Sequence, residues 1–129
     1  KKKKRFGRTL SNRAPSMLLS CLERKLKYNG LKLNKVTTSK VKASQYNHFD
    51  DTYTKKPLNK RWNDFNGIIV QRDLYSSFLL MNMVHDKDLD KIDRDLCFKT
   101  FDLFLQHHDE LISKLKKEPH TLKSMGVRL

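Results

Sequence analysis

The feature that most constrains the fold is an apolar stripe that repeats at three- and four-residue steps between about Asp95 and Lys117. This spacing places apolar side chains on one face of a helix. Asp93 is a suitable N-cap for such a helix, and Pro119 is a suitable stop. The sequence therefore predicts a long amphipathic C-terminal helix that buries one face. The stripe consists of Phe98, Phe101, Leu105, His108, Ile112 and Leu115.

Two further segments favour helices. One begins at Pro15, which suits a first helical turn, and ends before Asn29-Gly30, which suits a C-terminal stop. The other runs from Leu74 to Met83 and is apolar enough to be a buried helix. The first of these helices is expected to be amphipathic, with apolar positions at Leu18, Leu19, Leu22 and Leu26.

The segments between the helices have weaker patterns. Alternation of apolar and polar residues from Leu31 to Thr38 predicts a short strand with one buried face. From Ser39 to Asn66 the sequence is polar and dotted with aromatic residues, which predicts a long irregular excursion. Residues 68–70 are too few to classify, and acidic residues between 86 and 93 predict a linker before the last helix.

Positive charge is concentrated in the first half of the chain. The net charge is +14, and the residues from Lys1 to Trp62 include 18 basic and 3 acidic side chains, against 10 basic and 11 acidic side chains after them. A localised field of this kind attracts polyanions and favours nucleic acid as the partner. Lysines that serve solubility alone are expected along the whole chain, so the uneven distribution argues against that alternative.

The two cysteines and the hydropathy pattern indicate the cellular compartment in which the protein is expected. Cys21 and Cys97 both fall among apolar neighbours, which is typical of reduced core residues in a cytosolic protein. No apolar run approaches the roughly 18 residues that a membrane span requires. We therefore expect a cytoplasmic protein without a membrane partner.

Three short motifs occur in one order between about Phe6 and Asn82. They are Arg13-Ala14-Pro15-Ser16-Met17 at a helix start, Lys42-Ala43-Ser44-Gln45, and Gln71-Arg72-Asp73-Leu74-Tyr75-Ser76-Ser77-Phe78-Leu79. Together they resemble the C-terminal part of the OrfB or TnpB family, the transposon-encoded RNA-guided nucleases related to type V CRISPR effectors.

The resemblance implies an α/β chain that is a fragment of an RNase H-like (RuvC-type) nuclease domain. Residues 1–84 would form the C-terminal part of that domain, with an insert at about 46–66, and residues 85–129 would form the amphipathic helix and tail. The chain begins at Lys1 and not at Met, so an upstream part of the same polypeptide is also expected.

Asp73 is the candidate catalytic residue. The resemblance implies that it is the third of three acids that hold Mg²⁺ ions for DNA cleavage, because it lies in an Arg-Asp motif at a helix start. The other two acids would lie upstream of Lys1, so the site is incomplete and this fragment is not expected to be active alone. Without the resemblance, Asp73 would be interpreted as an acid that stabilises a helix N-terminus.

The interval from Tyr46 to Asn66 departs from the family pattern. Members of the family commonly carry a zinc ribbon with two Cys-x-x-Cys pairs there, and this interval contains no cysteine. We therefore expect no zinc, with Trp62 and Phe65 packing in place of the metal. Tyr53 or Trp62 is an alternative stacking platform for an unpaired base.

The expected function is that of a nucleic-acid-binding segment of a transposase-type, RNA-guided, metal-dependent DNA endonuclease. Its partners would be DNA and a guide RNA in the prokaryotic cytoplasm, near the nucleoid. The alternative is a non-catalytic DNA- or RNA-binding remnant of a decayed transposase, and a third hypothesis is a helical protein-interaction module. The candidate contacts to nucleic acid are Lys2, Lys3, Lys4, Arg5, Arg8, Lys42, Lys55, Lys56, Lys60, Arg61 and Arg72.

Overall fold

The computed structural model describes residues 15–86, 89–118 and 125–127. Contacts within the chain separate two compact units, Lys1–Lys35 and Val36–Leu129. The expected division into residues 1–84 and 85–129 stays a prediction.

The helix of the first unit, α2 (Pro15–Tyr28), confirms the prediction from Pro15 and Asn29-Gly30. Gly30 has a left-handed φ of 69°, and its N–H donates to the carbonyl of Lys27 while the N–H of Leu31 donates to that of Leu26. This is the Schellman arrangement that commonly ends a helix at glycine. The helix therefore starts and stops where its local sequence predicts.

The strand expected from Leu31 to Thr38 is wrong. Residues 31–37 form no regular element, and a short helix, α3 (Thr38–Val41), follows them. Alternation alone does not make a strand, since the backbone N–H and C=O groups also need a neighbouring strand. Instead, the N–H of Thr37 donates to Oδ2 of Asp90 at 2.7 Å, and Val41 is buried in the core.

The strands of the second unit form three antiparallel hairpins. These are β1 (Tyr46–Asn47) with β2 (Thr52–Tyr53), β3 (Trp62–Phe65) with β4 (Ile68–Gln71), and β5 (Met83–Asp86) with β6 (Leu89–Ile92). The mixed helix-and-strand class is therefore confirmed. The finer expectation, a fragment of an RNase H-like domain, stays a prediction.

The β3–β4 hairpin begins inside the segment that was expected to be irregular. Its two-residue loop is Asn66-Gly67, and both residues have positive φ, 53° and 95°. Asn-Gly is favoured in such loops because the type I′ turn requires positive φ at both central positions. The signal was present, and the expected irregular segment through Asn66 is wrong at this end.

The acidic linker expected between residues 86 and 93 is also wrong. The segment forms the β5–β6 hairpin, in which Met83 lies opposite Ile92 and both side chains are buried. Burial of these two apolar residues outweighs the high charge of the hairpin's other positions.

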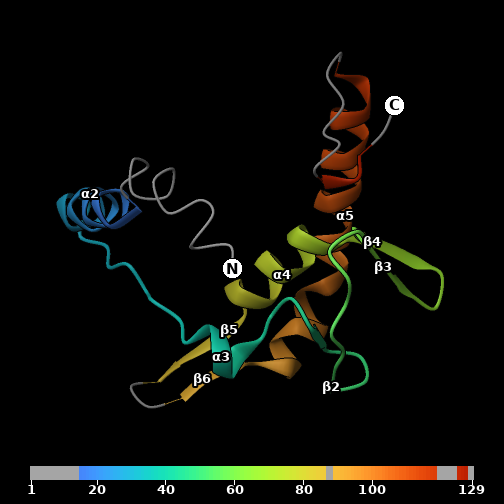
Figure 1. The fold of residues 1–129 in the computed structure, drawn as a ribbon, viewed down its shortest axis with the longest axis horizontal. Helices are drawn as coiled ribbons and strands as arrows, with labels where there is room; N and C mark the ends of the chain where they lie inside the picture. Colours follow the sequence, from blue (N-terminus) through green and yellow to red (C-terminus); the bar gives the residue numbers. More distant parts are fainter. Residues whose placement is uncertain (1–14, 87–88, 119–124, 128–129) are drawn as a thin grey trace, which may run out of the picture. The chain divides into compact units, whose positions relative to one another are not determined.

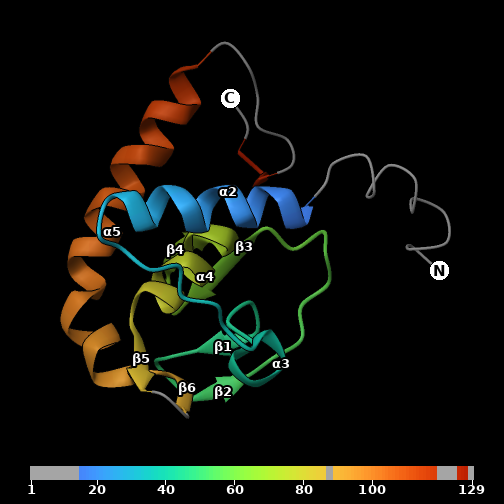
Figure 2. The same cartoon turned by 90° about the vertical axis from the view of Figure 1, so that its left-hand side faces the viewer.

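The core joins α4 (Arg72–Met81) and α5 (Arg94–Lys117) to buried residues of α3 and of the three hairpins. Figures 1 and 2 show the arrangement of these elements. Asp93 caps α5 by accepting from the N–H of Leu96, as predicted, and Pro119 lies outside the described residues. The stripe of α5 is partly confirmed, since Phe98 remains 46% exposed. The core residues are Val41, Tyr46, Val70, Tyr75, Phe78, Leu79, Met83, Ile92, Cys97 and Phe101.

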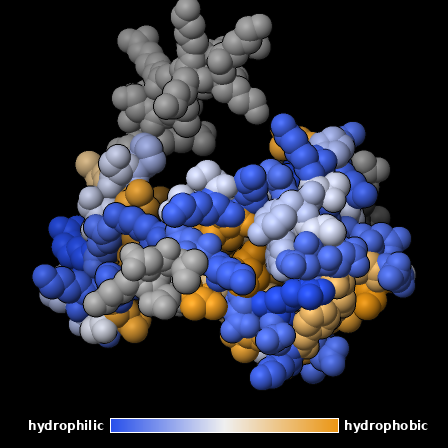
Figure 3. Space-filling view, turned by 90° about the horizontal axis from the view of Figure 1, so that it is seen from below, coloured by the Kyte–Doolittle hydropathy of each residue, from blue (hydrophilic) through white to orange (hydrophobic). Residues whose placement is uncertain are grey.

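Many large apolar side chains remain outside this core. Met81 and Leu103 are 69% and 58% exposed, respectively. On the face drawn in Figure 3, patches of hydrophobic side chains interrupt a mainly hydrophilic surface. The core is therefore modest for a chain of 129 residues.

Candidate nucleic-acid interface

Gln71 builds the start of α4. Its Oε1 accepts from the N–H groups of Asp73 and Leu74 at 2.8 and 2.9 Å, so a glutamine side chain is the cap of this helix. Its Nε2 donates to the carbonyl of Met125 and to Oδ2 of Asp73. Gln71 is fully buried, and its amide holds the first turn of α4 and the Asp73 carboxylate together.

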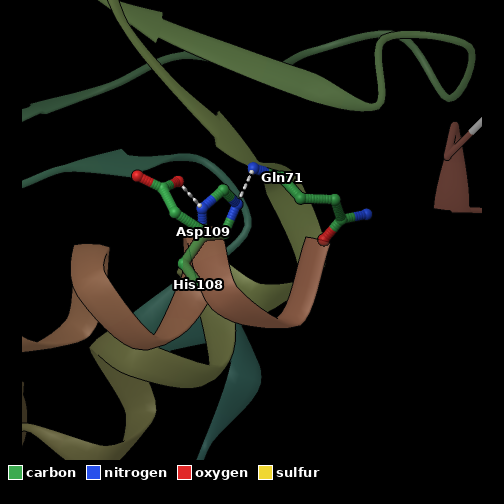
Figure 4. A network of polar contacts seen from close by, with 3 residues as sticks. All are labelled: Gln71, His108 and Asp109. Carbon is green, nitrogen blue, oxygen red and sulfur yellow. Dashed lines mark hydrogen bonds and ion pairs between the residues drawn. The ribbon is translucent and has the colours of Figure 1, made fainter. Parts of the chain in front are cut away.

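His108 fixes the backbone of this corner (Figure 4). The N–H of Gln71 donates to Nε2 of His108 at 3.0 Å, and Nδ1 of His108 lies 2.9 Å from Oδ1 of Asp109. Because Nε2 accepts, this hydrogen-bond pattern assigns the ring proton to Nδ1, which donates to Asp109. The apolar stripe predicts that His108 faces the core, but its spacing does not reveal this hydrogen bond to Gln71.

Asp73 lies where its motif predicts, in the exposed first turn of α4. A carboxylate at this position also stabilises the helix through the helix dipole, which is the role expected of Asp73 without the family resemblance. Among the described residues, no three His, Cys, Asp or Glu side chains are placed to hold a metal ion. Asp73 alone therefore does not make a Mg²⁺ site, and a pair of ions would need carboxylates from outside this part of the chain.

Three of the predicted cationic residues lie close to one another. Nη1 of Arg72 donates to the carbonyls of Pro57 and Lys60, at 3.0 and 3.2 Å, which ties the segment before β3 to the start of α4. Burial lowers the pKa of Lys56 below its ordinary value, and the charges of Lys60 and Arg72 lower it further.

This group of Lys56, Lys60 and Arg72, hereafter the cationic cluster, is held mainly by backbone and amide oxygens. Where the chain is described, none of the three forms an ion pair with a carboxylate. Their positive field is therefore left to attract an external anion.

The other predicted contacts are more scattered. Lys42 is exposed at the end of α3, and Lys55 is exposed in the segment before β3. Arg61 is half-buried, with its stem against the segment at Gly126. The contacts predicted near the N-terminus, Lys2, Lys3, Lys4, Arg5 and Arg8, lie outside the described residues.

Aromatic packing holds the insert of residues 46–66. Phe65 packs against Phe49 and Tyr75, with ring centroids 5.2 and 4.9 Å away. The half-buried Trp62 donates from Nε1 to the carbonyl of Gly126 at 3.1 Å. The packing roles predicted for Trp62 and Phe65 are therefore confirmed, whereas the expected absence of zinc stays a prediction.

His48 is the most enclosed polar side chain of this insert. Its Nδ1 lies 2.6 Å from the hydroxyl of Tyr75, and burial, with a smaller contribution from Arg94, lowers its pKa to about 4. The N–H of His48 donates to the same hydroxyl at 3.1 Å, which leaves the tyrosine proton to donate to Nδ1. His48 is therefore a neutral core residue.

No protein-family model matches the chain, and neither a curated protein nor a solved structure shows significant similarity to it. Among the helices of the described residues, none is both long and apolar enough to cross a membrane.

Proposed function

We propose that this chain binds nucleic acid, and that the cationic cluster contacts phosphate groups of the backbone. The observation that carries the proposal is the gathering of Lys56, Lys60 and Arg72 without carboxylate partners among the described residues. Phosphates bind such groups and release counterions as they do so. The surplus of basic residues before Trp62 supports the same partner.

We further propose that the chain is the C-terminal segment of a transposase-type, RNA-guided, metal-dependent DNA endonuclease with an RNase H-like domain. Asp73 would supply one of three Mg²⁺-binding carboxylates, and the other two would come from an upstream part of the polypeptide. The exposed carboxylate of Asp73 in the first turn of α4 supports this proposal, together with the Gln71-Arg72-Asp73 motif. On the basis of the family resemblance, the proposal also includes a guide RNA as a partner and a location near the nucleoid.

The alternative proposal is a non-catalytic remnant that binds DNA or RNA. It requires only the cationic cluster, and no three His, Cys, Asp or Glu side chains among the described residues are grouped as metal ligands. Both proposals predict binding that weakens steeply as salt rises. Only the endonuclease proposal also predicts that the protein cleaves DNA.

Binding and cleavage are tested separately. The chain is titrated with labelled single-stranded and duplex DNA and with RNA over a series of salt concentrations, and failure to bind at low salt rejects both proposals. Asp73→Asn is then introduced into the polypeptide that carries this chain, and Mg²⁺-dependent cleavage is measured. Loss of cleavage with retained binding supports the endonuclease, and unchanged cleavage contradicts the role of Asp73. Asp95→Asn is the matched control, because Asp95 is likewise an acid in the first turn of a helix.

A further inference from the structure

A small polar cleft opens beside the cationic cluster. It has a volume of about 120 Å³ and lies between the β1–β2 hairpin and β3. The cleft is contained within the second unit and is independent of the first. Its polar lining includes Asn47, Thr54, Lys56, Lys60, Asn63 and Asp64.

Lys56 is fixed at this cleft. Its Nζ donates to Oδ1 of Asn63 at 2.5 Å and lies 6.0 Å from the centroid of the Phe65 ring. Asn63 is only 3% exposed, so the amide that orients the ammonium group is itself held rigidly in strand β3. An ordered lysine has already lost much of the side-chain entropy that binding normally costs.

The charges around Lys56 favour an anion. Lys60 lines the same cleft, and Arg72 is close enough to act on Lys56 electrostatically. No carboxylate in the described residues forms an ion pair with these three groups. An anion in the cleft would relieve their mutual repulsion and stabilise all three.

Neutral donors complete the cleft. Oδ1 of Asn63 already accepts from Lys56, which leaves its N–H₂ group as a donor, and the hydroxyl of Thr54 can also donate. A cavity of about 150 Å³ can hold benzene. A volume of about 120 Å³ therefore has room for a phosphate group.

We infer that this cleft is a phosphate site that seats one backbone phosphate of a bound nucleic-acid strand, with Lys56 and Lys60 as its cationic contacts. The inference rests on the proposed nucleic-acid binding and adds a defined binding site for one phosphate. Free phosphate or a mononucleotide offers the same chemistry, so the experiment includes each of them.

Asp64 provides a test through gain of affinity. Its Oδ1 accepts from the N–H of Gly67 at 2.8 Å in the β3–β4 turn, and its charge lies at the cleft. Asp64→Asn retains an oxygen acceptor for that bond and removes the negative charge. A seated phosphate should then bind about threefold more tightly. Unchanged or weaker binding contradicts the site.

Loss of affinity is measured with Lys56→Gln and Lys60→Gln. Each should weaken oligonucleotide binding by about threefold to tenfold and reduce the slope of log K against log salt by about 0.7–0.9. Lys99→Gln is the matched control, since Lys99 is exposed on α5, lies outside the cleft lining and loses the same charge. Equal losses in all three variants would point to a diffuse surface and overturn the inference.

A measurement on the wild-type chain removes any effect of substitution on folding. Lysine acetylation is followed by mass spectrometry with inorganic phosphate, a mononucleotide or an oligonucleotide present. Stronger protection of Lys56 and Lys60 than of Lys99 by the oligonucleotide, at a lower concentration than the other two ligands require, supports a backbone site. Equal protection by inorganic phosphate at that concentration reassigns the cleft to a free anion. Oligonucleotide binding without preferential protection overturns the inference but leaves the proposed function standing, whereas absence of binding rejects both.

Discussion

The main-chain N–H of Gln71 donates to Nε2 of His108 across 3.0 Å, and this bond joins the end of β4 to the middle of α5. Both residues are buried, at 0% and 4% exposure. The N–H at the end of a strand and start of a helix has no partner in either element. A side chain 37 positions away in the sequence therefore satisfies it.

Replacement of His108 should show the weight of this contact. His108→Phe retains a ring but removes the acceptor, which leaves a buried N–H without a partner and should lower the free energy of unfolding by about 1–3 kcal/mol. Chemical denaturation followed by circular dichroism measures the loss. His107→Phe is the matched control, because His107 is exposed and the same substitution there should change stability by less than about 0.5 kcal/mol. Equal effects would contradict a structural role for His108.

The helices could be predicted because their signals are local. Pro15 and Gly30 bound α2, and Asp93 caps α5, each through contacts within a few residues. The β3–β4 hairpin also has a local signal, because Asn66-Gly67 is typical of a two-residue turn with positive φ at both positions. Alternation alone misled in the segment from residues 31 to 38, because it carries no information about a neighbouring strand.

The candidate site could be predicted only in part. Arg72 and Asp73 follow from their motif, but the partners of Arg72 are backbone carbonyls of Pro57 and Lys60, which no side-chain pattern reveals. The cleft beside Lys56 likewise depends on Asn63, a residue with no distinctive local signal. Contacts that fix these side chains arise from the fold of the whole unit.

Arg94 connects α5 to the insert, and its geometry is specific to arginine. Its Nε and Nη2 donate to the carbonyls of His48 and Phe49, both at 2.7 Å. A lysine ammonium cannot reproduce this planar pair of donors. Arg94→Lys should therefore lower the free energy of unfolding by about 1–3 kcal/mol, measured by urea titration.

The control is Arg24 on α2, whose side chain is exposed and donates only to Sγ of Cys21 among the described residues. Arg24→Lys should leave the urea midpoint nearly unchanged. A similar shift for both variants would show that the two bonds from Arg94 contribute little.

The buried His48 should make stability depend on pH. The pKa of His48 is about 4 in the folded chain, below its ordinary value of 6.5, because burial and Arg94 disfavour the imidazolium. As pH falls from about 6.5 to 4, the unfolded chain takes up a proton that the folded chain does not. Stability is therefore lost across this window, by up to about 3 kcal/mol, and is unaffected by this group above it.

Comparison with His48→Phe isolates this contribution. Phenylalanine fits the aromatic surroundings and does not titrate, so the difference in unfolding free energy between wild type and variant should narrow or reverse as pH falls from 7 to 4. Parallel pH profiles would mean that His48 gains its proton as readily in the folded chain as in the unfolded chain.

Gly126 is required where the chain passes against β3. Its φ is +74°, and an added Cβ would lie 2.6 Å from Cβ of Arg61 and 3.0 Å from Nε1 of Trp62. Gly126→Ala should therefore displace this segment and break the bond from Trp62 to the carbonyl of Gly126, with a loss of about 2–3 kcal/mol. The chain has a single tryptophan, so its fluorescence should shift to longer wavelength as the indole becomes hydrated. Gly67→Ala is the control, because φ there is +95° but the space is open. Gly67→Ala should lower the free energy of unfolding by about 1 kcal/mol through backbone strain and leave the fluorescence unchanged. A fluorescence shift in Gly67→Ala as well would show that the signal does not report on the contact at Gly126.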